Sequence, residues 1–203
     1  MYPAPLYTET DPAFIAAFMR EHSFACLTSV TADGLRATHA PLAFVADEGP
    51  HGALYGHLSA ENPQCAAFDG QHQAMAVFNG PHAYVSPLWV REPAREVPTW
   101  DYISAQATGR PVALAPEETP QLIADLVAAY EGSEGWKLDS MSPNYRDKLF
   151  TRVTPFRMPV ETLLCVRKMH QNRAAEDRTM VIARLREAGE GATADAIAAA
   201  MGG

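Results

Sequence analysis

Histidine, cysteine and serine side chains are the first candidates for chemistry in this chain of 203 residues. None of its seven histidines stands in an H-E-x-x-H or similar ligand spacing, so the sequence predicts no metal site. No G-x-S-x-G turn surrounds a serine, and Cys26 and Cys165 lie in apolar runs typical of buried packing residues. A serine or cysteine hydrolase is therefore disfavoured. His39 and His57, each late in an expected strand, are the first candidates for proton transfer.

Phosphate binding is the next chemistry to consider. Neither a G-x-x-x-x-G-K-[ST] loop nor a G-x-G-x-x-G turn occurs, so a bound nucleotide or flavin would be held by side chains and strand backbones. Polar clusters at 36–42, 56–64, 97–102 and 168–178 place hydroxyls, amides and cations near expected strand ends. Such groups can coordinate a phosphate, and neighbouring aromatic rings can stack on a planar ligand. The same residue types also make ordinary turns, so each cluster alone has both interpretations.

The aromatic stretch 78–90, FNGPHAYVSPLWV, raises the same choice. It combines a Gly-Pro turn signal with a β-type run in which polar and apolar residues alternate. This pattern fits either a core strand with polar decoration or one wall of a site for a flat ligand.

Composition limits the classes of protein. A hydrophobic content of 47% is enough for one domain with a sizeable core. The net charge of −8 is not typical of a general nucleic-acid binder, although residues 166–187 concentrate basic side chains. Three widely spaced cysteines indicate a reducing compartment, and residues 1–20 contain no apolar run of the signal-peptide type. We therefore expect a cytoplasmic protein with no membrane partner, since no segment approaches the roughly 20 apolar residues of a membrane span.

The elements that must position these residues can be read from turn and cap signals. Asp11 and Pro12 mark the start of a helix, and the Ala-Asp-Gly turn at 32–34 predicts a hairpin. Strands are expected at 25–30, 35–45, 53–58, 74–80, 82–87, within 97–113 and at 156–169. Helices are expected at 12–19, 60–68, 117–132, 142–150 and 174–201, the last with a break at 189–191. Five to seven largely consecutive strands without strand–helix alternation favour an α+β architecture with an antiparallel sheet, either open or closed into a barrel.

Six blocks in this order resemble the PaiB-like family of FMN-binding negative transcriptional regulators. They are MYPAP, ATHAPL, GHLSAENPQ, FNGPHAYVSPLWV, VPTWDY and KMHQNRAAEDR, and they extend over nearly the whole chain. The resemblance implies a split β-barrel flanked by helices, similar to pyridoxamine-phosphate-oxidase-like flavoproteins. It further implies a homodimer with FMN at the subunit interface. Residues 1–173 would form the FMN-binding domain, and 174–203 a helical tail packed on, or swapped between, the subunits.

The resemblance also implies which residues contact the cofactor. They are Arg36, Thr38, His39, His57, Ser59, Asn62, Tyr84, Ser86, Trp89, Thr99, Trp100, Lys168, Gln171, Asn172 and Arg173.

The chain departs from the family pattern at several positions. Ala60 stands where the family has an arginine, so one charge-assisted bond of about 1.5–3 kcal/mol to the phosphate is missing. His57, Arg36 and Arg173 are the residues that could compensate. Asp101 replaces an asparagine and His170 a serine. Cys65 and Val90 replace aromatic residues of the pattern.

Three functions remain open from the sequence. The first is an FMN-binding protein of this family, which includes the possibility of an FMN-dependent reductase or oxidase. The second is a negative transcriptional regulator that binds DNA through the basic stretch at 166–187. The third is a diverged split barrel that binds haem or another flavin.

Overall fold

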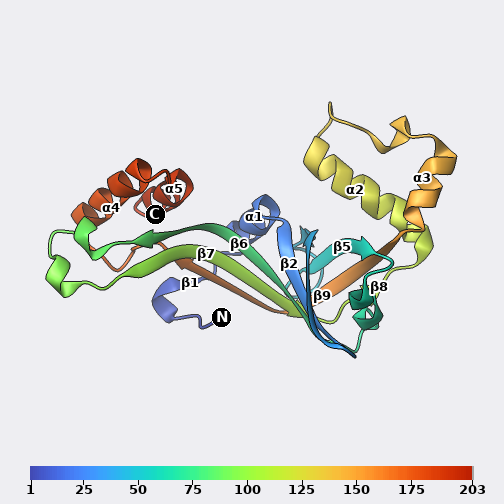
Figure 1. Ribbon diagram of the computed structural model, residues 1–203, viewed down its shortest axis with the longest axis horizontal. Helices are drawn as coiled ribbons and strands as arrows, with labels where there is room; N and C mark the ends of the chain where they lie inside the picture. The colour runs from blue at the N-terminus through green and yellow to red at the C-terminus, as the bar shows by residue number, and fades with distance from the viewer. Residues whose placement is uncertain (203) are drawn as a thin grey trace. The chain divides into compact units, whose positions relative to one another are not determined.

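The structure is a computed structural model that describes residues 1–202. Within these residues the chain forms nine strands and five α-helices (Figure 1). The strands are β1 (Thr8–Glu9), β2 (Phe24–Thr31), β3 (Gly34–Pro41), β4 (Ala43–Val45), β5 (Ala53–Ser59), β6 (Ala74–Val85), β7 (Thr99–Gly109), β8 (Val112–Ala113) and β9 (Val153–Lys168). The helices are α1 (Pro12–Glu21), α2 (Thr119–Glu131), α3 (Pro143–Phe150), α4 (Ala175–Glu187) and α5 (Gly191–Ala199).

The strands form one sheet whose path is β3-β2-β6-β7-β9-β5-β4, and β1 and β8 both pair with β9. The hairpin β2–β3 is antiparallel, as are the pairs β2–β6, β4–β5 and β5–β9. The α+β prediction with an antiparallel sheet is therefore confirmed. No ladder within residues 1–202 joins β3 to β4, so the sheet is not closed.

The chain divides into two compact units. Unit 1 comprises residues 1–15, 79–105 and the chain from 164 onward, and unit 2 comprises 16–78 and 106–163. Strands β6, β7 and β9 each continue from one unit into the other.

The core of unit 2 is made of apolar side chains from its strands. Leu27, Leu42, Leu54 and Phe156 are all fully buried. In β5 the buried residues alternate with partly exposed ones, which is the period of a strand with one face on a core. At the β2–β3 turn Gly34 has φ +103°, a conformation that glycine adopts readily, and this explains why the Asp-Gly signal located the hairpin correctly.

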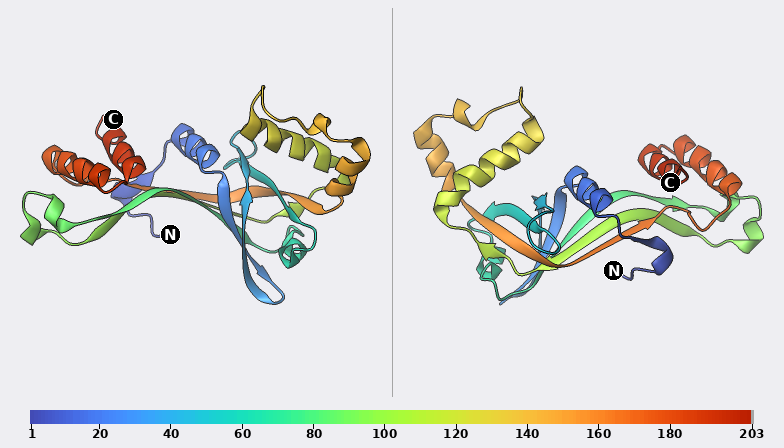
Figure 2. Two further views of the ribbon diagram at one scale, coloured as in Figure 1. Left: turned by 45° about the horizontal axis from the view of Figure 1, so that its top comes forward. Right: turned by 180° about the vertical axis from the view of Figure 1, so that it is seen from behind.

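The C-terminal helices contribute buried apolar side chains to the core of unit 1. Helices α4 and α5 lie side by side in both views of Figure 2, and Val181, Leu185 and Ile197 are their fully buried apolar residues of large size. The segment Gly189–Gly191 falls at the break between the two helices, as expected.

Two expectations about strands were wrong. The single strand expected at 35–45 is divided into β3 and β4, because β3 pairs with β2 whereas β4 pairs with β5. The two strands expected at 74–80 and 82–87 are one strand, β6. The β2–β6 register ends at Val77, so the missing N–H of Pro81 interrupts no bond to β2.

Candidate functional site

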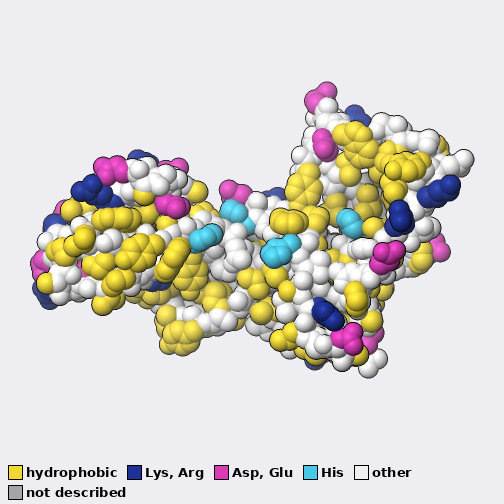
Figure 3. Space-filling view, viewed as in Figure 1, with side chains coloured by type: hydrophobic (Ala, Val, Ile, Leu, Met, Phe, Trp, Pro, Cys, Tyr) yellow, Lys and Arg dark blue, Asp and Glu magenta, His cyan; other side chains and the backbone are white. Residues whose placement is uncertain are grey.

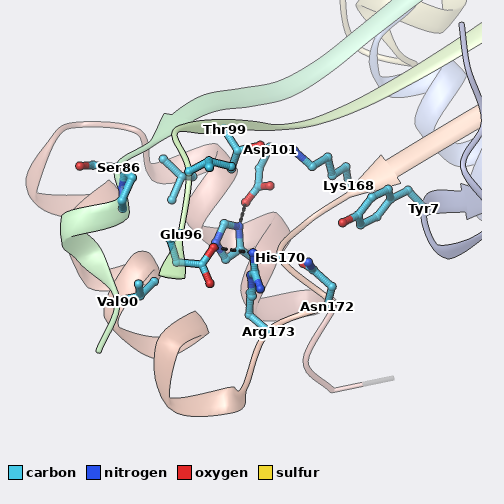
Figure 4. A pocket seen from close by; sticks show the side chains of 13 residues that line it. Tyr7, Ser86, Val90, Glu96, Thr99, Asp101, Lys168, His170, Asn172 and Arg173 are labelled. Carbon is cyan, nitrogen blue, oxygen red and sulfur yellow. Dashed lines mark hydrogen bonds and ion pairs between the residues drawn. The ribbon is translucent and has the colours of Figure 1, made fainter. Parts of the chain in front are cut away.

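A cavity in unit 1 gathers several of the predicted site residues. Its volume is about 170 Å³, and it lies between the end of β6, the start of β7 and the turn after β9 (Figure 4). The predicted residues that line it are Ser86, Thr99, Lys168, Asn172 and Arg173. Tyr7, Glu96, Asp101 and His170 also line it and were not predicted as site residues.

Lys168 ends β9 and is held by neutral groups. Its ammonium donates to the Thr99 hydroxyl and, at 2.7 Å, to the Trp100 carbonyl. The same nitrogen lies 5.9 Å from the centre of the Tyr7 ring. The lysine pairs with no carboxylate among residues 1–202, so its charge is not neutralised by an ion pair.

Arg173, in contrast, is already paired. Its guanidinium donates to the Glu96 carboxylate, and 36% of the arginine side chain and 17% of the glutamate side chain are exposed. A partly buried pair of this kind leaves little net charge for a phosphate. Arg173 is therefore a poor replacement for a missing cation at position 60.

Asp101 and His170 form a buried pair at the back of the cavity. His170 Nδ1 lies 2.5 Å from Asp101 Oδ2, and the relative exposures of His170 and Asp101 are 6% and 0%. The second carboxylate oxygen, Oδ1, is buried with no hydrogen-bond partner in the described chain. His170 also has φ +55°, which is uncommon for a residue with a side chain and is often found at functional sites. Both residues are departures from the family pattern, and this was the signal that could have drawn attention to them.

A second group of predicted residues forms an exposed aromatic face on β6 and β7. The Trp100 ring lies 6.2 Å from that of Tyr84 and 6.4 Å from that of His82. Trp100 is 55% and Tyr84 44% exposed. Figure 3 shows hydrophobic side chains gathered over this part of the sheet. The strand alternation sets this face apart from the cavity, because Trp100 is exposed while its neighbour Asp101 is buried.

Two other predicted site residues of unit 1 have local structural roles. Gln171 closes the turn after β9: its side chain accepts from the Met169 amide at 2.6 Å and donates to the Arg167 carbonyl at 2.5 Å. Trp89 ends a short 3₁₀ helix, Pro87–Trp89, and is half-buried.

In unit 2, Thr38 and Asn62 belong to a hydrogen-bond network. The Thr38 hydroxyl donates to the Gln64 side chain at 2.8 Å and accepts from the Asn62 amide at 3.0 Å. Gln64 is fully buried and also donates to the Leu27 carbonyl and the Ser29 hydroxyl at 2.9 and 3.0 Å. These contacts tie the segment after β5 to the β2–β3 hairpin, so Thr38 and Asn62 serve the fold at this point. Gln64 was not among the residues predicted from the sequence.

Arg36, His39 and Ser59 are the exposed predicted residues of unit 2. The guanidinium of Arg36 has only a 3.7 Å contact with Asp33, and both side chains are exposed, so this pair contributes little. His39 lies on the same strand, with its ring 5.8 Å from that of Phe24. Arg36 therefore keeps its charge available for an anion.

His57 does not offer a positive charge. Burial lowers the pKa of its imidazole below the ordinary value of 6.5, so the ring is neutral at pH 7. Its Nδ1 atom is buried and has no hydrogen-bond partner in residues 1–202. A neutral ring can donate or accept a hydrogen bond, but it cannot replace an arginine beside a phosphate.

Arg152 is a cation near position 60 that was not predicted from the sequence. The Ala60 amide donates to the Arg152 carbonyl at 2.9 Å, where β5 ends beside the start of β9. The side chain of Arg152 is exposed and forms no ion pair in the described part of the chain. Its distance of 92 positions from Ala60 gave no local signal for this proximity.

The side chains described above can be compared with what the ring system and the phosphate of FMN require. Exposed aromatic rings on β6 and β7 suit a planar ring system, and Arg36 and Arg152 suit a phosphate. The cavity of about 170 Å³ is smaller than the roughly 300–1,000 Å³ of pockets that enclose a ligand of this size. The donor set therefore fits a flavin, but the cavity by itself does not enclose one. No three His, Cys, Asp or Glu side chains of the described chain converge as metal ligands.

Two proteins of known sequence are similar over most of the chain. The protease synthase and sporulation protein PAI 2 of Bacillus subtilis is 29% identical over 189 residues, covering 91% of this chain and 89% of that protein. An uncharacterised protein of Aspergillus fumigatus is 28% identical over 233 residues, covering 90% of this chain and 89% of its own length.

Two solved structures share the fold at low sequence identity. The FAD and heme binding protein of Mycobacterium smegmatis superposes with a TM-score of 0.63 at 14% identity, covering 85% of this chain and 79% of that chain. The flavocytochrome Anf3 of Azotobacter vinelandii gives 0.64 at 13% identity, covering 86% and 75%. This likeness agrees with the α+β split-barrel prediction, which is confirmed.

The family model described as "Putative FMN-binding domain" matches residues 1–162, about four fifths of the chain. No helix in residues 1–202 has the length and apolarity needed to cross a bilayer. The family match covers every element from β1 to most of β9, including the aromatic face and the network around Gln64. The chain therefore belongs to this family of FMN-binding domains.

Proposed function

We propose that this protein binds FMN and that the isoalloxazine ring lies against the aromatic face of β6 and β7. The carrying observation is the exposed cluster of His82, Tyr84 and Trp100 within the family domain. Large aromatic side chains are costly to leave in water, and their faces stack on planar ligands.

Unit 2, taken by itself, also carries side chains that suit a phosphate group. Arg36 on β3 and Arg152 before β9 are exposed guanidinium groups without a strong partner in the described chain. Each can make a charge-assisted, bidentate contact with a phosphate. The hydroxyl of Ser59 and the ring of His39 are further hydrogen-bonding groups on the same sheet, on β5 and β3.

A second copy of the chain completes this proposed site. The unit 1 cavity is too small to enclose a flavin, and Tyr84 and Trp100 remain open to solvent in one chain. A partner that covers the aromatic face would remove water from both the rings and the ligand. In this proposal the C-terminal helices α4 and α5 support the subunit to which they belong.

Bound FMN supplies electron or hydride transfer, as flavins do. The residues of this chain hold and orient the cofactor and exclude water from it. A reductase or oxidase activity is the enzymatic form of this proposal.

DNA binding has weaker support. Two arginines of α4 are engaged in ion pairs, Arg184 with Glu187 at 2.8 Å and Arg186 with Asp195 at 2.9 Å. These pairs reduce the positive charge that a helix offers to phosphates. A regulatory role would rest on the resemblance to the regulator family alone.

The test is a titration of the purified protein with FMN, followed by flavin absorbance and fluorescence. We expect Trp100→Ala and Tyr84→Ala each to weaken FMN binding by about tenfold, the loss of one stacking contact. Trp136→Ala is the matched control, because Trp136 is similarly exposed, at 46%, but lies on neither β6 nor β7. Failure of the wild-type protein to bind FMN would refute the proposal. Parallel titrations with FAD and haem show whether another ligand is preferred, and sedimentation with and without FMN tests the second copy.

A further inference from the structure

The cavity of unit 1 faces away from the proposed flavin surface. Trp100 and Asp101 are neighbours in β7, and their side chains lie on opposite faces of the strand: Trp100 is exposed, and Asp101 is fully buried and lines the cavity. A ligand in the cavity would therefore not contact the face of Tyr84 and Trp100. The two ligands would thus contact different faces of β7.

Asp101 has an unmet need for a hydrogen-bond donor. One carboxylate oxygen accepts from His170 at 2.5 Å, and the other has no partner within residues 1–202 although it is buried. A buried carboxylate oxygen without a donor is costly, because it has lost its water and gained nothing in return. A ligand that brings an N–H group to this oxygen would remove the cost.

Lys168 has the opposite need. Its ammonium has three N–H groups, and its hydrogen bonds to Thr99 and Trp100 are with neutral oxygens. No carboxylate of the described chain pairs with it. Figure 4 shows the Asp101 carboxylate with His170 on one side and Lys168 on the other. The cavity is thus lined by one anion and one cation that are not paired with each other.

His170 fixes the position of the anion. Its Nδ1 bonds to Asp101, and its main-chain carbonyl accepts from the Arg173 amide at 3.0 Å. His170 has a left-handed backbone, φ +55°, and its imidazole meets Asp101 of β7. His170 is therefore a positioning residue for Asp101.

The remaining charges around the cavity are neutralised. Glu96 and Arg173 pair with each other, so neither adds a net charge to the cavity. The volume of about 170 Å³ corresponds to about six molecules of liquid water, at about 30 Å³ each. A ligand of about five or six non-hydrogen atoms fits this space.

We propose that this cavity binds a small zwitterionic amino acid, whose ammonium group donates to Asp101 and whose carboxylate contacts Lys168. Glycine, alanine and β-alanine have the charges and the size that the cavity requires. A molecule with only one of the two charges satisfies only one of the two side chains.

The test is calorimetric titration of the full chain with glycine and β-alanine, with ethanolamine and acetate as probes that carry one charge each. We expect at least one of the two amino acids to bind at millimolar concentration, and each one-charge probe to bind at least about tenfold more weakly. We expect Lys168→Gln and Asp101→Asn each to weaken amino-acid binding by about tenfold or more. Lys137→Gln and Glu187→Gln are matched controls, since both residues are exposed and neither lines the cavity.

Asp101 is buried, so Asp101→Asn is checked for folding by circular dichroism, and Lys168→Gln carries the conclusion if that variant is unfolded. His170→Asn should weaken amino-acid binding, as expected of a positioning residue, while FMN binding stays unchanged. The proposal is overturned if neither amino acid binds to the wild-type chain, or if acetate or ethanolamine binds as tightly as the amino acids. Unchanged binding in Lys168→Gln would also overturn it.

Discussion

The amide nitrogen of Ala60 lies 2.9 Å from the carbonyl oxygen of Arg152, to which it donates a hydrogen bond. Position 60 has no cation of its own, and this bond places the backbone of an arginine beside it. The relationship matters because a phosphate bound in unit 2 at this end of β5 needs positive charge.

An arginine at position 60 should strengthen FMN binding. We expect Ala60→Arg to lower the Kd for FMN by roughly ten- to a hundredfold, since a charge-assisted bond contributes about 1.5–3 kcal/mol. Fluorescence titration at moderate salt measures the change. Ala188→Arg, on the exposed end of α4 in unit 1, is the control and should leave the Kd unchanged.

The same titration tests Arg152. Arg152→Ala should weaken FMN binding, and adding Ala60→Arg to it should restore the loss. If Ala60→Arg leaves the affinity unchanged, the phosphate does not lie at this strand end.

We expect removal of the hydrogen-bond network around Gln64 to lower the stability of the protein strongly. Gln64→Ala removes the hydrogen bonds to Leu27, Ser29 and Thr38 and leaves their polar groups buried without a partner. We expect the free energy of unfolding to fall by about 2–4 kcal/mol. Urea denaturation measures it. Gln73→Ala is the control: Gln73 is exposed, and its loss should change stability by less than about 0.5 kcal/mol. Equal effects of the two variants would show that the network does not stabilise the fold.

Because His57 is partly buried, we expect the protein to be less stable at acidic pH. Burial lowers its pKa in the folded chain below the value of 6.5 that it has when unfolded. As the pH falls below 6.5, the unfolded chain therefore binds a proton before the folded chain does, and the free energy of unfolding decreases until the pH passes the lower folded pKa. Urea denaturation between neutral and acidic pH should show a shallower slope for His57→Gln than for the wild type. His51→Gln, at an exposed position, should keep the wild-type slope.

At Gly109 we expect a single added methyl group to clash with the backbone. A Cβ atom at this position would lie 2.0 Å from the Pro159 carbonyl oxygen, a backbone atom that a side-chain rotation cannot move. We expect Gly109→Ala to lower the free energy of unfolding by about 1–3 kcal/mol. Gly191→Ala is the comparison, because nothing lies within 4 Å of a Cβ added there, at the start of α5. That variant should be neutral or slightly stabilising, and thermal unfolding of the two proteins should separate them clearly.

The sequence predicted most elements because their signals are local. Asp11 and Pro12 start α1, Gly34 turns the β2–β3 hairpin, and Gly132 ends α2 with φ +67°. The prediction of five to seven strands fell short of the nine observed, because β1 and β8 have two residues each and no detectable pattern. The division of 35–45 also escaped prediction, since it depends on which strand each half pairs with: β3 with β2 and β4 with β5.

The sequence by itself determined the α+β class, the position of most elements and the family to which the chain belongs, because caps, turns and motif blocks act over a few residues. The tertiary structure decided which side chains meet. Asp101 and His170 are 69 positions apart, and Thr38 and Gln64 are 26 apart. Contacts at such separations depend on strand register, and a slip of one residue turns each side chain to the other face of the sheet. The predicted cofactor residues were therefore divided among the cavity, the aromatic face and the strands of unit 2 by pairing that no local pattern specifies.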